Sequence, residues 1–301
     1  MTLAPIVLFV YNRPEETKQT IAALAKNDLA AASELFIFCD GAKGETDKKS
    51  VAEVRNIVRS LTGFKNIVII ERDKNYGLAQ SVISGVTEIV NKYGKVIVLE
   101  DDLLTSPQFL TFINDGLEIY QTEPQVGIIH AHIYNIKNLP ELFFISKIGC
   151  WGWGTWARAW NKVSFDGQEL LDKIKADKTE RLFDVDNSYP YLKMLENQIA
   201  GKNSSWAIRM YASFFTQGML ALNPGRSLVE HIGYRGTHYG IGFKTEMDGI
   251  ITNEPISCRF LELKNNPEAL MKMADFYRQE LKFKLKVFIF KAWNKIVKKI
   301  L

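Results

Sequence analysis

The chain has 301 residues, of which 47% are hydrophobic and 24% are charged, a balance typical of a folded globular protein rather than a disordered one. The net charge is only +4, so composition does not indicate a general nucleic-acid-binding surface, and we expect no nucleic-acid partner. No stretch approaches the roughly 20 apolar residues of a transmembrane helix, and no signal sequence is evident. Three widely spaced cysteines (Cys39, Cys150 and Cys258) match neither a zinc nor a disulfide pattern, which favours a reducing cytoplasm.

Short apolar runs alternate with helical patterns over the first 130 residues. This alternation predicts an α/β fold with a mostly parallel sheet and helices on both faces. We expect strands at 6–10, 35–38, 67–70, 96–99 and 126–130, and helices at 14–26, 48–61 and 75–93 and from 106 to just before Pro124. The start of the last helix is predicted from Ser106-Pro107, a capping residue followed by proline.

Polar side chains follow three of these strands at the point where each strand ends. They are Tyr11-Asn12-Arg13, Asp40 and Glu100-Asp101-Asp102. In open parallel sheets, ligands bind beyond the carboxyl ends of the strands. We therefore expect these residues to converge on one rim of the sheet.

The acidic triplet Glu100-Asp101-Asp102 is the strongest chemical signal. Adjacent carboxylates repel one another unless a positive charge lies among them. Mg²⁺ and Mn²⁺ prefer oxygen ligands and often bind one or two carboxylates together with substrate phosphates. The alternative is a solvated acidic loop, but four apolar residues directly before the triplet favour a metal site.

Three further charged residues carry weaker signals. Asp40 could accept a hydrogen bond from a base or a ribose, although aspartate before glycine is also common in turns. Arg13 and Lys74 could meet phosphate or nucleoside, and each is as readily explained as ordinary surface charge.

With these strand-end residues, the first 130 residues resemble the nucleotide-binding half of a family 2 glycosyltransferase of the GT-A fold. The matching segments are 5–14, the strand end at Asp40, 75–79 and 98–102, and the triplet is also similar to that of N-acetylglucosaminyltransferase I. The resemblance extends over roughly residues 5–245. It implies a GT-A domain at 1–245, with a nucleotide-sugar half at 1–130 and an acceptor half at 131–245, followed by a C-terminal extension at 246–301.

The resemblance also implies roles for individual residues. The uridine would be held by Tyr11, Asn12, Arg13 and Asp40, with Lys74 near the nucleotide. Glu100 and Asp101 would contact ribose and donor sugar, and Asp102 would bind Mn²⁺ or Mg²⁺. The segment 236–240 would be a loop that closes over the donor, and its His238 would touch the diphosphate or the metal, or have no role.

The tryptophan-rich segment 150–160 is expected on the acceptor side. Aromatic faces stack on sugar rings, so Trp151 and Trp153 are candidate acceptor contacts, with a packed core as the alternative. The pattern of the resemblance places a catalytic acid directly after Trp206, where this chain has Ala207. Glu196, Asp186 and Glu230 remain weak candidates for the base, and a retaining mechanism stays open.

The segment 278–301 contains eight Lys or Arg residues and one acid, Glu280, interleaved with apolar residues. A helix with these features suits an anionic membrane surface, and docking on the protein's own core or on a partner protein are the alternatives.

Together these features predict a cytoplasmic glycosyltransferase, peripheral at the inner face of the plasma membrane, that transfers sugar from a UDP-sugar to a saccharide or lipid-linked saccharide. A nucleotidyltransferase is one alternative, but such enzymes usually carry a glycine-rich basic loop after the first strand, and Tyr11-Asn12-Arg13-Pro14 is not one. A non-catalytic sugar-binding protein is the other, to which Ala207 gives some weight.

Overall fold

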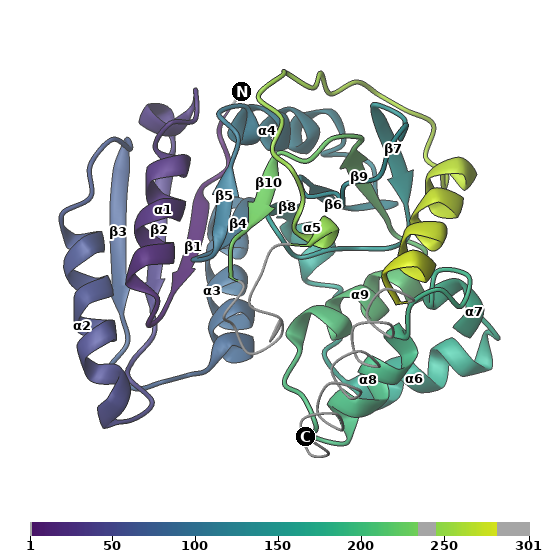
Figure 1. Ribbon diagram of the computed structural model, residues 1–301, viewed down its shortest axis with the longest axis horizontal. Helices are drawn as coiled ribbons and strands as arrows, with labels where there is room; N and C mark the ends of the chain where they lie inside the picture. Colours follow the sequence, from purple (N-terminus) through teal and green to yellow (C-terminus); the bar gives the residue numbers. More distant parts are fainter. Residues whose placement is uncertain (1, 234–244, 282–301) are drawn as a thin grey trace, which may run out of the picture.

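The computed structural model of the chain describes residues 2–233 and 245–281 (Figure 1). Its centre is an eight-stranded sheet in the order β3-β2-β1-β4-β8-β6-β9-β7, with helices on both faces. Six strands run in one direction, and β8 and β7 run in the other. The expected α/β fold with a mostly parallel sheet and helices on both faces is therefore confirmed.

The first half of the sheet consists of four parallel neighbours: β1 (Ile6–Val10), β2 (Glu34–Cys39), β3 (Asn66–Glu71) and β4 (Lys95–Glu100). They are connected by α1 (Pro14–Leu24), a 3-10 turn at Ala30–Ala32, α2 (Glu45–Arg59) and α3 (Leu78–Tyr93). These strands were expected, with bounds within one or two residues. Strands β1, β2 and β4 are continuous apolar runs because most of their residues are buried on both faces of the sheet, whereas the edge strand β3 is partly exposed.

The second half of the sheet reverses direction. Strand β8 (Trp153–Trp156) lies antiparallel between β4 and β6 (Val126–His130). Next come β9 (Leu220–Pro224), parallel to β6, and the edge strand β7 (Leu142–Ile145). The chain thus brings its tryptophan-rich segment back to the middle of the sheet, directly beside β4.

A second, two-stranded sheet lies over the strand ends. Its strands are β5 (Leu103–Thr105), directly after the acidic triplet, and β10 (Val229–His231), which pairs with it in antiparallel fashion. Because β5 takes up 103–105, α4 (Phe109–Ile119) begins later than Ser106-Pro107 predicted. The Ser106 hydroxyl instead accepts the Gln108 backbone N–H within a turn.

The remaining helices are α5 (Ala157–Trp160), α6 (Gly167–Ala176), α7 (Glu180–Phe183), α8 (Tyr191–Ile199), α9 (Trp206–Thr216), a 3-10 turn at Glu246–Asp248 and a helix over 267–281. Helices α6 to α9 form a lobe beside the sheet (Figure 1). The basic segment predicted as an amphipathic helix lies almost wholly outside the described residues.

Two hydrophobic layers pack on the two faces of the sheet. Phe9 and Phe38 belong to the layer with α3 and α9, whereas Leu8 and Ile37 belong to the layer with α1, α2 and α4. Alternate residues of one strand therefore serve both layers. The layers fix β1, β2 and β4 against each other, and with them the residues that follow each strand.

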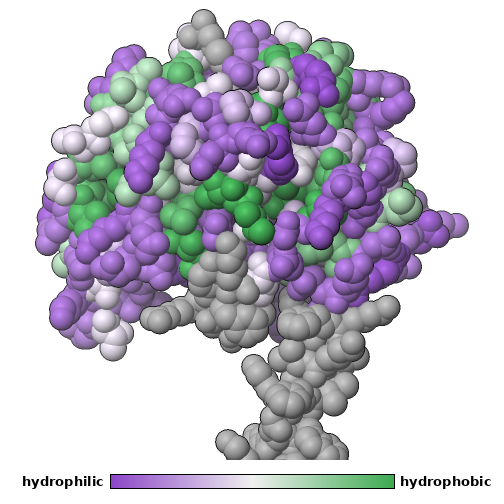
Figure 2. All heavy atoms as spheres, turned by 45° about the horizontal axis from the view of Figure 1, so that its top comes forward, coloured by the Kyte–Doolittle hydropathy of each residue, from purple (hydrophilic) through white to green (hydrophobic). Residues whose placement is uncertain are grey.

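In the described part of the chain, no helix is both long and apolar enough to cross a membrane. On the face shown in Figure 2, hydrophilic side chains predominate and hydrophobic residues form patches between them.

A glycine in β8 sets how closely α4 approaches the sheet. A Cβ on Gly154 would lie 2.6 Å from Cγ2 of Ile113 and 3.1 Å from Cδ1 of Leu117, both in α4. We expect Gly154→Val to lower the free energy of unfolding by about 1–3 kcal/mol, because overpacking forces the helix away from the sheet. Urea denaturation measures the loss. Gly44→Ser is the control, because a Cβ on Gly44 would have no other atom within 4 Å. An equal loss of unfolding free energy in both variants would contradict the prediction.

Candidate functional site

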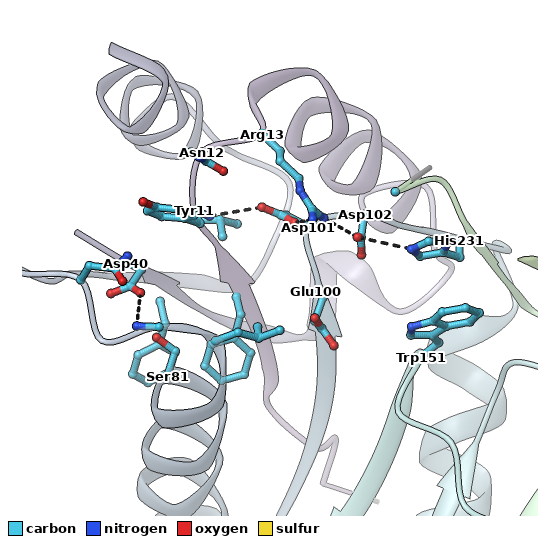
Figure 3. Close-up of a pocket in the computed structure, with 17 residues that line it drawn as sticks. Tyr11, Asn12, Arg13, Asp40, Ser81, Glu100, Asp101, Asp102, Trp151 and His231 are labelled. Atoms are coloured by element: carbon cyan, nitrogen blue, oxygen red, sulfur yellow. Dashed lines mark hydrogen bonds and ion pairs between the residues drawn. The ribbon is translucent and has the colours of Figure 1, made fainter. Parts of the chain in front are cut away.

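A cavity of about 450 Å³ opens at the carboxyl ends of β1, β2 and β4 (Figure 3). Its walls also include the start of α3, the segment before β8 and the end of β10. The structure places eight of the predicted site residues in its lining: Tyr11, Asn12, Arg13, Asp40, Glu100, Asp101, Asp102 and Trp151. Residues from three separate strand ends thus converge on one rim.

The parallel register explains this convergence. Phe9 in β1 is level with Glu100 in β4, and Val10 is level with Cys39 in β2. The residues after these strands are therefore neighbours. The Tyr11 backbone N–H donates to Oδ2 of Asp101 at 3.2 Å, and the Asp40 N–H donates to the Val10 carbonyl at 3.0 Å.

Asp40 organises the side of the cavity at the start of α3 by accepting three backbone N–H groups. Its Oδ1 accepts from Gly41 at 3.0 Å and Tyr76 at 2.9 Å, and its Oδ2 accepts from Gly77 at 3.0 Å. The Gly77 φ of +74° suits a residue without a Cβ, and α3 begins directly after it. Asp40 therefore joins the end of β2 to the start of α3, and its carboxylate lines the cavity.

Two supporting residues were missed in the sequence. Asp47 at the start of α2 accepts hydrogen bonds from the Tyr11 hydroxyl at 2.7 Å and the Asn12 amide at 3.4 Å. Arg72 is buried, and its guanidinium carbon lies 4.3 Å from the centroid of the Tyr76 ring and 5.3 Å from that of Phe38. Neither residue carries a local sequence signal, because each acts on a segment far from its own position in the chain.

The acidic triplet lies opposite Asp40 and is compensated by two basic side chains. Nη1 of Arg13 forms an ion pair with Oδ2 of Asp102 and lies 3.5 Å from Oδ1 of Asp101. On the other side, Nε2 of His231 lies 3.5 Å from the same Oδ2 of Asp102 (Figure 3).

His231 is the most important residue that the sequence did not reveal. It is the last residue of β10, and the Ile232 N–H donates to the Asp102 carbonyl at 2.9 Å, so pairing with β5 holds it beside the triplet. Its Nδ1 lies 3.0 Å from Oδ1 of Asp248, which is fully buried and also accepts from the Thr245 hydroxyl at 3.0 Å. The sequence offered one signal for His231 as a candidate site residue, namely that the chain has only four histidines.

Burial and mutual repulsion shift the acids of the triplet. Burial, with the charges of Asp102 and Asp101, raises the pKa of Glu100 to about 8, and burial with the charge of Asp102 raises the pKa of Asp101 to about 7. Burial opposes ionisation of Asp102 as well, but the hydrogen bond and charge of His231, together with Arg13, lower its pKa. Asp102 is thus the triplet acid held ionised.

His231 shows the complementary shift. Burial favours the neutral ring, but hydrogen bonds to Asp102 and Asp248 outweigh it and raise the pKa of His231 to about 9. The imidazolium between two carboxylates therefore compensates part of their charge.

The two tryptophans considered for acceptor contacts lie in different environments. Trp151 lines the cavity; its ring stacks on His231 with centroids 4.4 Å apart and meets the edge of His132 at 4.8 Å. Trp153 has no exposed surface and packs between Trp160 and Trp206. Trp153 as a sugar contact is corrected to a core residue, because its side chain packs into the hydrophobic layer that contains Trp160 and Trp206, whereas Trp151 lies in the loop before β8, at the cavity wall.

Other predicted residues lie outside the cavity lining. Lys74 contacts the Tyr76 ring, with Nζ 5.8 Å from its centroid. The base candidates are also elsewhere: Glu196 pairs with Lys193 and Lys175 on the surface, Asp186 pairs with Arg181 and Arg278, and Glu230 in β10 pairs with β5. In this arrangement none of these three reaches the cavity. His238 lies outside the described residues.

The surroundings of Asp102 fit a divalent cation. An oxygen and an imidazole nitrogen 3.5 Å apart are near the separation of about 3 Å expected for adjacent ligands of one octahedral ion. Gly233 leaves room there, since a Cβ on it would collide with Oδ2 of Asp102 and lie 2.8 Å from Nε2 of His231. Among the described residues no three His, Cys, Asp or Glu side chains form a metal-binding group. An ion held by Asp102 and His231 would therefore need further ligands from water or substrate.

The sequence matches neither a known protein-family profile nor a curated protein. Among solved structures the chain is similar to the mannosyltransferase PcManGT from Pyrobaculum calidifontis, solved with GDP-Man and Mn²⁺, at 9% identity, a TM-score of 0.40, and coverage of 72% of this chain and 69% of that one. It is also similar to mouse xyloside xylosyltransferase 1, at 10% identity, a TM-score of 0.39, and coverage of 72% and 83%. A third similar structure is a UDP-glucose pyrophosphorylase in complex with UDP-glucose, at 10% identity, a TM-score of 0.35, and coverage of 74% of this chain and 90% of that one. At these TM-scores, the function has to be argued from the site itself.

The shifted histidine makes stability depend on pH in the metal-free protein. Because the folded pKa of about 9 exceeds the ordinary value, the contribution of the charged ring is complete below about pH 6.5 and disappears as pH rises through 9. We expect the difference in the free energy of unfolding between the parent and His231→Asn to shrink by on the order of 2 kcal/mol across that window. Urea denaturation in EDTA at pH 6, 7.5 and 9 measures it, and a difference that does not change with pH would contradict the assignment.

Proposed function

We propose that this protein is a metal-dependent glycosyltransferase that uses a nucleotide-sugar donor, with a UDP-sugar as the favoured class. The observation that carries the proposal is the arrangement of Asp102 and His231 at the distance of two ligands of one ion, within the cavity that also contains Asp40. Such a cavity has a place for a nucleoside at one end and for a metal-bound diphosphate at the other.

The donor would lie along the carboxyl ends of β2, β1 and β4. The base and ribose would occupy the side formed by Asp40, Tyr11 and Asn12, whose positions are fixed by hydrogen bonds to backbone groups and to Asp47. Glu100 and Asp101 would contact ribose and sugar. A volume of about 450 Å³ lies within the usual size of ligand pockets, roughly 300–1,000 Å³.

Asp102 and His231 would hold Mn²⁺ or Mg²⁺, whose charge would neutralise the departing diphosphate. Asp248 would fix the tautomer of His231 by accepting its Nδ1–H, and the Nε2 proton that the metal-free site holds toward Asp102 would be released as the metal binds. In the reaction, a bond forms between the acceptor oxygen and the anomeric carbon while the bond from that carbon to the phosphate oxygen breaks. The phosphate oxygen keeps the electron pair and leaves on the nucleoside diphosphate, and the proton of the acceptor hydroxyl passes to water.

The acceptor would be a saccharide or a lipid-linked saccharide, approaching from the Trp151 side of the cavity. One face of the Trp151 ring is already stacked on His231, so an acceptor sugar would meet its remaining surface. We assign no catalytic base, because Glu196, Asp186 and Glu230 do not line the cavity. Location at an anionic membrane surface in the cytoplasm is proposed from the basic segment 278–301 alone.

The proposal is tested by calorimetric titration with UDP and with GDP, each with and without Mn²⁺. We expect UDP to bind with Mn²⁺ and to bind at least tenfold more weakly in EDTA, and we expect Asp102→Ala and His231→Ala to lose the Mn²⁺-dependent part. The physical reason is that each substitution removes one of the two protein ligands.

Glu196→Gln is the matched control, because it removes a carboxylate that pairs with Lys175 and Lys193 outside the cavity lining and should leave binding unchanged. If UDP and GDP both bind without any effect of Mn²⁺, or not at all, the metal-dependent glycosyltransferase is wrong. Release of pyrophosphate from UTP and a sugar phosphate would instead identify a nucleotidyltransferase.

A further inference from the structure

Arg13 contacts the same carboxylate oxygen that a metal would need. Its Nη1 pairs with Oδ2 of Asp102, and this is the oxygen that lies 3.5 Å from Nε2 of His231 (Figure 3). Arg13 comes from the loop between β1 and α1, whereas His231 comes from β10. The guanidinium and the imidazole thus approach Asp102 from two sides.

Arg13 also provides the permanent positive charge of the triplet. Within residues 2–233 and 245–281, the ion pairs of Asp101 and Asp102 are with Arg13 and His231 alone. Arginine stays charged at all relevant pH values. Without it, the carboxylates would be left buried with less compensation, so the guanidinium takes the part of a bound cation.

The backbone of Arg13 is fixed by hydrogen bonds, whereas its side chain is partly exposed and is held by ion pairs with Asp101 and Asp102. The Arg13 carbonyl accepts from the Thr17 N–H at 2.9 Å and from the Thr17 hydroxyl at 2.6 Å, which anchors the residue at the start of α1. The side chain is 31% exposed, and the hydrogen bond that the guanidinium forms among the described residues is to Asp102. It can therefore exchange one acceptor for another without unfolding the helix start.

We propose that Arg13 is an internal counter-ion that competes with the divalent cation for Asp102 and that moves to the donor diphosphate when the metal binds. The inference rests on the proposed function. Two cations repel at one carboxylate oxygen, so the metal binds weakly while Arg13 stays there. Phosphate oxygens offer the guanidinium a bidentate partner of at least equal quality. Metal and nucleotide therefore promote each other's binding, and this coupling is reciprocal.

The first test needs no variant. The affinity of the full chain for Mn²⁺ is measured from the electron paramagnetic resonance signal of free Mn²⁺, with and without saturating UDP. We expect UDP to tighten Mn²⁺ binding at least tenfold. Equal Mn²⁺ affinity with and without UDP would overturn the coupling.

The second test removes the competitor. Arg13→Gln should bind Mn²⁺ in the absence of nucleotide at least tenfold more tightly than the parent, and UDP should then add less. Arg13→Lys keeps the charge and should stay near the parent value. Lys18→Gln, an exposed position on α1 paired with Glu15, removes the same charge away from the triplet and is the matched control.

The outcomes separate this inference from the proposed function. If Arg13→Gln binds Mn²⁺ no more tightly than the parent while UDP binding still requires Mn²⁺, the competition is wrong and the metal-dependent function stands. If no form binds Mn²⁺ with or without UDP, both are overturned. A thermal melt of each variant confirms that it is folded before its affinity is compared.

Discussion

The carboxylate of Asp102 is the group on which the rest of the site depends. It lies next to two other acids in a largely buried position, where like charges repel and water compensates poorly. Two basic side chains from distant segments, Arg13 and His231, form ion pairs with Asp102 and reduce this repulsion. The acids, the arginine and the histidine form one electrostatic unit, because the charges of the acids and of the histidine depend on the charges of their neighbours.

This unit requires the topology of the sheet. Parallel pairing of β1 with β4 places Arg13 beside the triplet, and pairing of β5 with β10 places His231 on its other side. The antiparallel β8 between β4 and β6 then brings Trp151 against the His231 ring. Asp248 orients the His231 ring through a hydrogen bond with Nδ1, the nitrogen that is not directed toward Asp102. Segments more than two hundred residues apart in the chain thus meet at one oxygen atom.

The two sides of the cavity are built on different principles. On the Asp40 side the groups are held by backbone hydrogen bonds, and Asp40 accepts three N–H groups that position the start of α3. On the triplet side the Asp102 carboxylate is held by ion pairs with Arg13 and His231, which other ions can replace. A rigid side suits recognition of a nucleoside, whereas a side held by replaceable ion pairs suits the entry of a metal with its diphosphate. This difference is the physical basis for proposing that metal and donor bind together.

The amino-acid sequence by itself determined the parallel half of the sheet and the acids at its rim. Strands buried on both faces are continuous apolar runs, as in Ile6–Val10, and polar residues directly after them mark the strand ends without reference to the rest of the chain. The same local logic was insufficient for Trp151 and Trp153, since Trp151 lies in the loop before β8 and lines the cavity, whereas Trp153 in β8 packs into the core. The sequence also placed Arg13 at this rim, but only the tertiary structure decided that it pairs with Asp102. Only the tertiary structure brought His231 and Asp248 to Asp102, because each is defined by a partner far away in the chain and leaves no periodic pattern around its own position.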